Sequence, residues 1–238
     1  MNTEKRKLNI LLLIFTLITS LMNAQNKTEL NIKQQSLVKI SSSTATGNIE
    51  QLKIQLNEGL DNGITINEIK EALVQLYAYC GFPRSLNAIT AFKTVLDERK
   101  SKGLKDKEGK TIIVENNPPD KYEQGRAVLE NLTQTPQSKP APGFGEFAPR
   151  IDTFLKEHLF ADIFASDVLS FQQRELVTIA ALASMEGVAS QLQAHLNMGK
   201  NTGITEKQFF QIAEIIQNAG NKNQADGMRE IINTIHSK

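Results

Sequence analysis

The sequence predicts an all-α protein made of two related helical repeats. Apolar residues recur at helical spacing along most of the chain. At several places Ser or Thr stands three positions before Glu or Gln, which is the pattern of a capping box at a helix N-terminus. One stretch also occurs twice, which indicates an internal duplication. With 238 residues, of which 40% are hydrophobic and 22% charged, the chain is long enough for one or two cores.

Residues 1–24 are predicted to be a secretory signal peptide. A basic segment at 5–7 precedes an apolar stretch at 8–21, and Ala24 suits the last position before cleavage. The apolar stretch is short for a spanning helix, although a retained membrane anchor is the alternative. Cleavage would make the protein periplasmic or secreted, with no membrane attachment. It would remove three Lys or Arg and one Glu and change the formal net charge from +1 to −1, and a near-neutral chain is not expected to bind nucleic acid.

The first repeat is predicted to span residues 33–100. Its opening helix contains a hydroxyl-rich run at 40–44, whose side chains need backbone partners if this helix is buried. Gly47 or Asn48 caps the next helix, 49–60.

The second half of this repeat has clear helix boundaries. Thr65 and Glu68 form a capping box, and the helix that they open ends near Gly81. Pro83 suits the first turn of the last helix, 85–100.

Residues 101–146 are predicted to connect the repeats. They contain a charged linker, a helix that Asp120 caps, and a loop at 133–145 rich in Pro and Gly. The second repeat, 147–236, is then expected to begin with an amphipathic α-helix at 148–165.

The second repeat contains the most regular pattern, at 174–205. Ser170 and Gln173 form a capping box, and apolar residues over most of the helix circumference predict a deeply buried helix. A break at Gly187 precedes a second helix, on which His195 lies on or beside the apolar stripe. The segments at 36–38 and 63–65 match those at 175–177 and 203–205 in one order and at nearly constant offset.

These residues resemble the carboxymuconolactone decarboxylase family, whose fold is shared with the alkylhydroperoxidase D-like proteins. The specific parts are Arg-Glu-Leu-Val-Thr-Ile-Ala-Ala-Leu-Ala at 174–183, Gln-Leu-x-x-His-Leu at 191–196 and Ala-Tyr-Cys-Gly-Phe-Pro at 78–83. The resemblance implies two such helical repeats in one chain, at 33–100 and 147–236. Single-copy members are commonly trimers or hexamers, so a two-copy chain is expected to form a homo-oligomer of three chains.

In the peroxidase branch of this fold, a C-x-x-C-x-x-x-H motif reduces peroxide with the help of a Glu on the preceding helix. The resemblance places that histidine at His195 and the two cysteines at Val188 and Gln191. Without a thiolate there is no nucleophile, which argues against dithiol chemistry. The single cysteine, Cys80, lies near a predicted helix C-terminus, where the macrodipole raises the pKa of a thiol. It is interpreted as a small buried residue, with one-cysteine peroxide reduction as the alternative.

His195 and Glu175 are the candidate catalytic residues. The resemblance places the family's histidine at His195, and Glu175 falls within one position of its glutamate. A carboxylate beside an imidazole tunes the charge state that acid–base catalysis requires. The alternatives are a core histidine bound to a carbonyl and a surface glutamate. The first repeat has Ser36 and Gln55 at these places, and neither titrates near neutral pH, so activity is expected only in the second repeat.

Arg174 and Gln191 are candidates for substrate binding. Arg174 could hold a carboxylate, or it could pair with Glu146 or Asp167. Gln191 could donate through its amide or simply face water, and His158 is expected to face water. The spacing of His, Cys and Glu fits no metal site, and no Gly-rich phosphate loop occurs, so neither a metal nor a cofactor is expected.

Three functions remain open from the sequence. The first is a cofactor-free enzyme of the decarboxylase type, which acts on a small molecule through His195 and Glu175. The predicted export favours a different small lactone or unsaturated carboxylic acid over carboxymuconolactone itself, because breakdown of aromatic acids is expected inside the cell. The second is peroxide reduction of the alkylhydroperoxidase or peroxiredoxin type through Cys80, and the third is a non-catalytic binding or structural scaffold.

Overall fold

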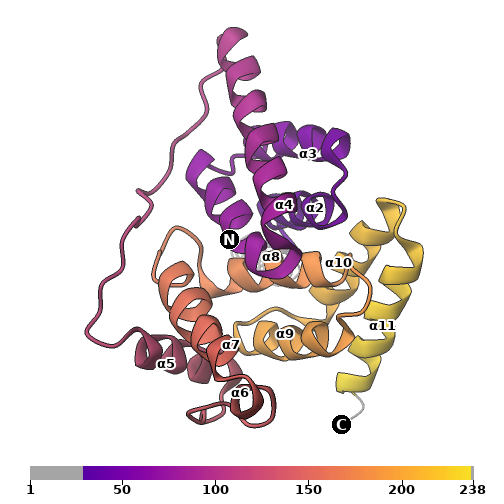
Figure 1. Cartoon of the computed structure of the whole chain (residues 1–238). Coiled ribbons are helices and arrows are strands. Elements are labelled where there is room, and N and C mark those ends of the chain that lie inside the picture. The colour runs from indigo at the N-terminus through magenta and orange to yellow at the C-terminus, as the bar shows by residue number, and fades with distance from the viewer. Residues whose placement is uncertain (1–28, 237–238) are drawn as a thin grey trace, which may run out of the picture.

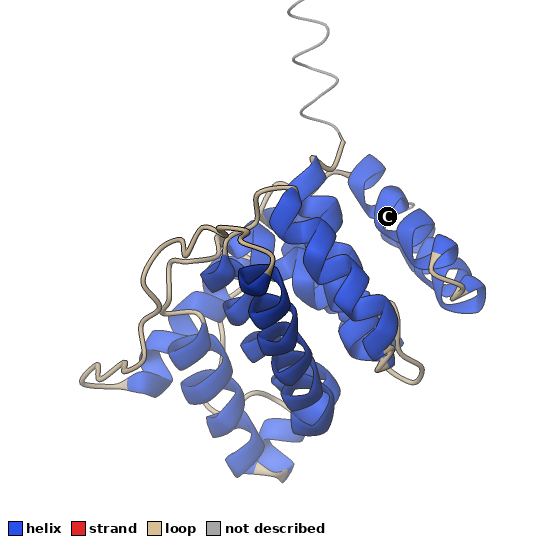
Figure 2. Ribbon diagram, turned by 90° about the horizontal axis from the view of Figure 1, so that it is seen from above, coloured by secondary structure: helices blue, strands red, loops and turns tan. Residues whose placement is uncertain are grey.

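The computed structural model describes residues 29–236 as helices joined by loops (Figure 1). Figure 2 shows no strand in this part of the chain, so the all-α prediction is confirmed. The predicted signal peptide, 1–24, lies outside the described residues. No helix within 29–236 combines the length and the apolar character needed to cross a membrane. The described helices are α2 (Ile32–Thr46), α3 (Ile49–Asp61), α4 (Ile66–Ser101), α5 (Lys121–Thr133), α6 (Phe144–Phe147), α7 (Pro149–Thr153), the π-helix η1 (Phe154–Ile163), α8 (Phe171–Leu182), α9 (Ala189–Asn201), α10 (Glu206–Asn218) and α11 (Lys222–His236).

Capping boxes begin the corresponding helices of both repeats. Thr65 and Glu68 form one at α4, as predicted, and Ser170 and Gln173 form another at α8. Two more, Asn31 with Gln34 and Thr205 with Gln208, open α2 and α10. Each box satisfies two amides that the first helical turn leaves without partners, and this local bonding explains why the boundaries agree with the sequence pattern.

The two repeats pack against each other through α2 and α8. The contacts are reciprocal, because α4 of the first repeat also touches α8, and α10 of the second touches α2. The hydroxyl-rich part of α2 is buried here, and its side chains find partners as expected. Ser41 Oγ donates to the Leu37 carbonyl over 2.7 Å, and Ser42 Oγ lies 2.8 Å from Ser184 Oγ across the junction. Hydroxyl groups can therefore occupy this interface without leaving unpaired polar atoms.

Helix α4 changes direction at Gly81. This residue has φ 83° and ψ 158°, a conformation that is accessible essentially only to glycine. Pro83 follows in the first turn after the kink, as the sequence predicted. The kink separates the segment with Tyr77 and Tyr79 from the helix that completes the first core.

Helix α5 of the connector and the first helices of the second repeat form a helical unit, which we call the appendage and define as 121–163. Figure 1 shows the segment that follows α4 running along one side of the molecule, so that the appendage lies at the end remote from α3. Within the appendage α5 packs on η1, and α5 also touches α9 of the second repeat. A Cβ on Gly125 would lie 1.8 Å from the Lys156 carbonyl oxygen, so α5 and η1 can approach this closely only because residue 125 is glycine.

The helix expected at 148–165 is not one regular α-helix. A short α7 is followed by the π-helix η1, in which the wider turn changes the residues that share a face. Leu159 and Phe160 are consequently buried, whereas Ile151 and Phe154 are 50% and 53% exposed. The prediction of a helix here was correct, but the apolar residues of the expected amphipathic helix do not all lie on one buried face.

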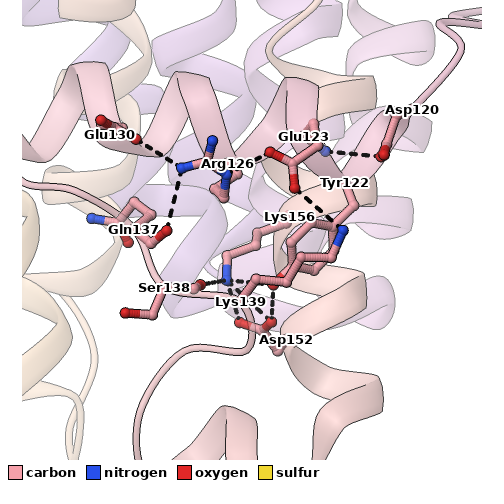
Figure 3. Close-up of polar contacts among 10 residues, drawn as sticks. All are labelled: Asp120, Tyr122, Glu123, Arg126, Glu130, Gln137, Ser138, Lys139, Asp152 and Lys156. Carbon is pink, nitrogen blue, oxygen red and sulfur yellow. Dashed lines mark hydrogen bonds and ion pairs between the residues drawn. The ribbon is translucent and has the colours of Figure 1, made fainter.

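A buried polar cluster holds α5, α7 and η1 together (Figure 3). Lys156 Nζ donates to Asp152 Oδ1 and to the Tyr122 hydroxyl, each over 2.8 Å, and to the Ser138 carbonyl over 2.9 Å. The Tyr122 hydroxyl donates to Asp152 Oδ2 over 2.5 Å. Burial favours the neutral carboxyl, but the hydrogen bonds from Lys156 and Tyr122 outweigh it and hold the pKa of Asp152 below its ordinary value. A buried charge of each sign is thus compensated within the appendage.

Candidate active site

His195 and Glu175 form a hydrogen-bonded pair between α9 and α8. The Nδ1 atom of His195 lies 2.8 Å from Glu175 Oε2. The Glu175 side chain is wholly buried, and that of His195 is 9% exposed. The turn between the two helices contains Gly187 with a φ of 78° and brings residues twenty positions apart into contact. Because Nδ1 faces the glutamate, Nε2 is the ring nitrogen that remains for a ligand.

The surroundings of this pair are largely apolar. The ring of Tyr79 packs edge-on against His195, with 5.3 Å between ring centroids. Burial first, and then the negative charge of Glu175, raise the pKa of the Tyr79 phenol. Glu175 Oε1 is buried without a hydrogen-bond partner among residues 29–236. Such an atom costs stability, so packing alone does not favour a glutamate at this position.

His195 lines a cavity of about 1020 Å³ between α4, α9 and the appendage. Helix α9 also contributes Gln191 to the lining, so two of the predicted site residues, His195 and Gln191, line the same cavity. The polar lining residues are Tyr77, Lys121, Glu157, His158, Asp162, Gln191 and His195. The remaining wall is apolar and comes mainly from the α4 kink and the appendage. The cavity is therefore built by residues of both repeats and of the connector between them.

The opposite wall carries a second histidine–carboxylate pair that the sequence did not reveal. His158 Nδ1 lies 3.3 Å from Asp162 Oδ2, and Lys121 Nζ lies 2.8 Å from Asp162 Oδ1. Burial alone would raise the pKa of Asp162, but hydrogen bonds from Lys121 and His158 outweigh it and lower the pKa. His158 is half exposed, as expected, yet it also lines the cavity beside Tyr77. The spacing of four between His158 and Asp162 was a usable signal, whereas the contact with Lys121 depends on the packing of α5.

Arg174 does not have the surroundings predicted for it. Its guanidinium is completely buried, with Nη2 at 3.0 Å from Glu71 Oε2 and Nη1 at 2.9 Å from Gln75 Oε1. Burial lowers the pKa of Arg174, and the carboxylate of Glu71 partly opposes this. Neither Glu146 nor Asp167 is its partner, and Arg174 is not among the residues that line the cavity. Arg174 is therefore not positioned to bind a substrate carboxylate in this cavity, because its Nη1 and Nη2 atoms donate to groups inside the protein.

Cys80 also lies outside the lining of the cavity. Its Sγ is 3.2 Å from the Leu76 carbonyl oxygen, and the side chain is half-buried against the first core. Burial raises the pKa of the thiol, and the nearby Arg84 only partly opposes this. The direction agrees with the prediction, and the largest cause is loss of hydration on burial.

The corresponding place in the first repeat has no acid–base pair. Ser36 Oγ donates to the Ile32 carbonyl and accepts from Asn62, and Gln55 Oε1 is buried without a hydrogen-bond partner in the described part of the chain. Among residues 29–236 no group of three or more His, Cys, Asp or Glu side chains could hold a metal ion.

Comparison with known proteins agrees with this architecture. A family model described as "Carboxymuconolactone decarboxylase family" matches residues 13–94 and 149–226, one segment for each repeat. A search of curated proteins gives no significant match. The match covers more than half of the chain and supports, at the level of the family, a function of the carboxymuconolactone decarboxylase or alkylhydroperoxidase D type. This all-α chain therefore belongs to the carboxymuconolactone decarboxylase family, as a member with two copies of the domain in tandem.

Proposed function

We propose that this protein is an exported, cofactor-free enzyme that uses His195 and Glu175 for acid–base chemistry on a small lactone or unsaturated carboxylic acid. The observation that carries the proposal is the 2.8 Å contact between Nδ1 and Glu175, which leaves Nε2 of a cavity-lining histidine as the ring nitrogen available to a ligand. The corresponding residues of the first repeat, Ser36 and Gln55, form no such pair.

The pair suits proton transfer at a carbon next to a carbonyl group. Nε2 takes the proton, the electron pair of the C–H bond passes into the carbonyl as an enolate, and Glu175 stabilises the imidazolium that forms. The imidazolium then returns the proton to a different atom of the ligand. In a decarboxylation, the lyase reaction for which the family is named, the C–C bond to the carboxylate breaks, CO₂ leaves and the electron pair of that bond forms an enolate. The imidazolium form of His195 then protonates the enolate carbon and takes up a new proton from water.

Deuterium exchange tests this chemistry without requiring that the reaction product be identified. Small lactones and unsaturated acids are incubated with the protein in D₂O, and NMR follows uptake of deuterium at carbon. We expect uptake with the unmutated protein and at least a hundredfold slower uptake with His195→Gln, in line with the usual weight of a general base. Gln193→Ala is the matched control, because Gln193 is an exposed residue of α9 that does not line the cavity. Equal uptake in the unmutated and His195→Gln proteins would contradict the proposal.

Two other functions are less well supported. Peroxide reduction requires Cys80, which lies outside the cavity and has a raised pKa. A non-catalytic scaffold does not account for a buried glutamate beside a histidine with one oxygen that no described residue bonds.

Export and assembly are further parts of the proposal. Export predicts a mature N-terminus near Gln25, and N-terminal sequencing of the protein from the cell envelope or the medium checks this.

Assembly of three chains would place six repeats around one axis, as closed cyclic symmetry favours. Light scattering is expected to give three times the mass of one chain, and a monomer mass at micromolar concentration would contradict the expectation.

A further inference from the structure

The walls of the cavity beside His195 are strongly apolar. Aromatic side chains come from the α4 kink and from the appendage, with Phe82, Phe144 and Phe154 remaining 61%, 53% and 53% exposed. A volume of about 1020 Å³ is at the upper end of the range for small-molecule sites. A ligand that fills this space would cover apolar surface that is now exposed to water, which favours binding of a bulky apolar molecule.

The charges that face the cavity do not favour an anion. Of the lining residues only Lys121 carries a fixed positive charge, and Asp162 neutralises it over 2.8 Å. Glu157 adds a negative charge to the same wall. Behind His195 lies the buried Glu175, which would repel a second carboxylate placed at Nε2.

The arginine next to Glu175 in the sequence cannot compensate for this. Arg174 precedes Glu175 in the sequence, but its guanidinium is sealed within the core and bonded to Glu71 and Gln75. A carboxylate that entered the cavity would lose hydration without gaining an unpaired cation among the lining residues, and such a transfer is strongly unfavourable.

We infer that the cavity takes an uncharged, largely apolar ligand with a carbonyl or hydroxyl oxygen that meets His195 Nε2, such as a neutral lactone, ketone or ester. This rests on the proposed function and narrows it, because it selects the uncharged substrates over the carboxylic acids. Gln191 lies one helical turn before His195 on α9 and lines the same space, so its amide is available to the same oxygen.

Two fluorescent probes with one skeleton test the charge preference directly. N-phenyl-1-naphthylamine is uncharged, and its 8-sulfonate carries one negative charge on the same rings. Calorimetric titration of the full protein is expected to show the uncharged probe binding at least about tenfold tighter than the sulfonate, the difference that loss of one charge-assisted hydrogen bond produces. Ala194→Phe fills part of the cavity and should weaken the uncharged probe by a similar factor, which places the binding in this cavity.

A gain-of-function variant completes the test. Gln191→Arg supplies a free cation to the wall, and it should raise the affinity for the sulfonate about tenfold. His195→Gln should keep the preference of the unmutated protein, because the preference comes from the walls and not from the reacting nitrogen. The preference can therefore hold even if deuterium exchange shows no catalysis. Equal or tighter binding of the sulfonate to the unmutated protein, or uncharged-probe binding that Ala194→Phe leaves unchanged, would overturn the inference.

Discussion

His195 Nδ1 and Glu175 Oε2 lie 2.8 Å apart, while the other oxygen of the same carboxylate is buried without a hydrogen-bond partner in the described part of the chain. One carboxylate oxygen of Glu175 therefore has a hydrogen-bonding partner to offset its burial, and the other does not. The arrangement is typical of a site where stability is given up for a chemical property.

This relationship predicts a non-additive effect on stability. His195→Leu leaves Glu175 buried without its partner and should lower the free energy of unfolding by about 3–5 kcal/mol. The double variant His195→Leu/Glu175→Leu removes both polar groups and should recover most of that loss. Urea unfolding of the two single variants and the double variant measures the coupling. Additive losses would show that the two residues do not depend on each other.

Gly125 should be required for the wall of the cavity. Gly125→Ala places a methyl group against the Lys156 carbonyl oxygen, where only backbone movement can relieve the contact. We expect a loss of at least about 1–3 kcal/mol of stability together with weaker binding of the uncharged probe. Gly227→Ala is the control, because a Cβ at Gly227 meets no atom within 4 Å. Unchanged thermal unfolding of Gly125→Ala would contradict the close approach of α5 and η1.

Asp152 should make the appendage sensitive to acid. Its lowered pKa means that the native state keeps the ionised carboxyl at pH values where the unfolded chain binds a proton. Its contribution to stability is therefore full above the unfolded pKa of about 3.9 and is lost as the pH falls through the lower native pKa.

The variant Asp152→Asn measures this contribution. It should cost on the order of 1–3 kcal/mol near neutral pH, because Lys156 stays buried with a weaker partner. The difference in free energy of unfolding between the two proteins should shrink as the pH is lowered below about 3.9. A difference that stays constant down to about pH 2.5 would show that Asp152 has an ordinary pKa in the native state.

Cys80 should react slowly with alkylating reagents. The raised pKa leaves less thiolate at a given pH than in a free cysteine, and the half-buried side chain restricts access further. The rate of alkylation by iodoacetamide should keep rising with pH beyond about 8.5, where a free thiol is already half ionised. Cys80→Ser should leave deuterium exchange unchanged, and thiol-dependent peroxide turnover lost in this variant would support peroxide reduction.

The sequence by itself determined the helical class, the duplication and most helix boundaries. Capping boxes such as Thr65 with Glu68 depend on bonds between residues three apart, so their effect is legible in a short window. The kink at Gly81 likewise follows from a backbone conformation that glycine alone adopts easily. The contact between His195 and Glu175 was predictable because a single turn joins their helices.

Only the tertiary structure decided which groups face the ligand space. Arg174 is bonded to Glu71, which lies 103 positions away, and no local pattern distinguishes that partner from the acids nearby in sequence. His158 and Lys121 reach the cavity because the appendage folds back onto α9, through contacts that include the backbone approach at Gly125. Periodicity reports how a segment bonds with itself, whereas the charge and shape of a cavity depend on which distant surfaces close against each other.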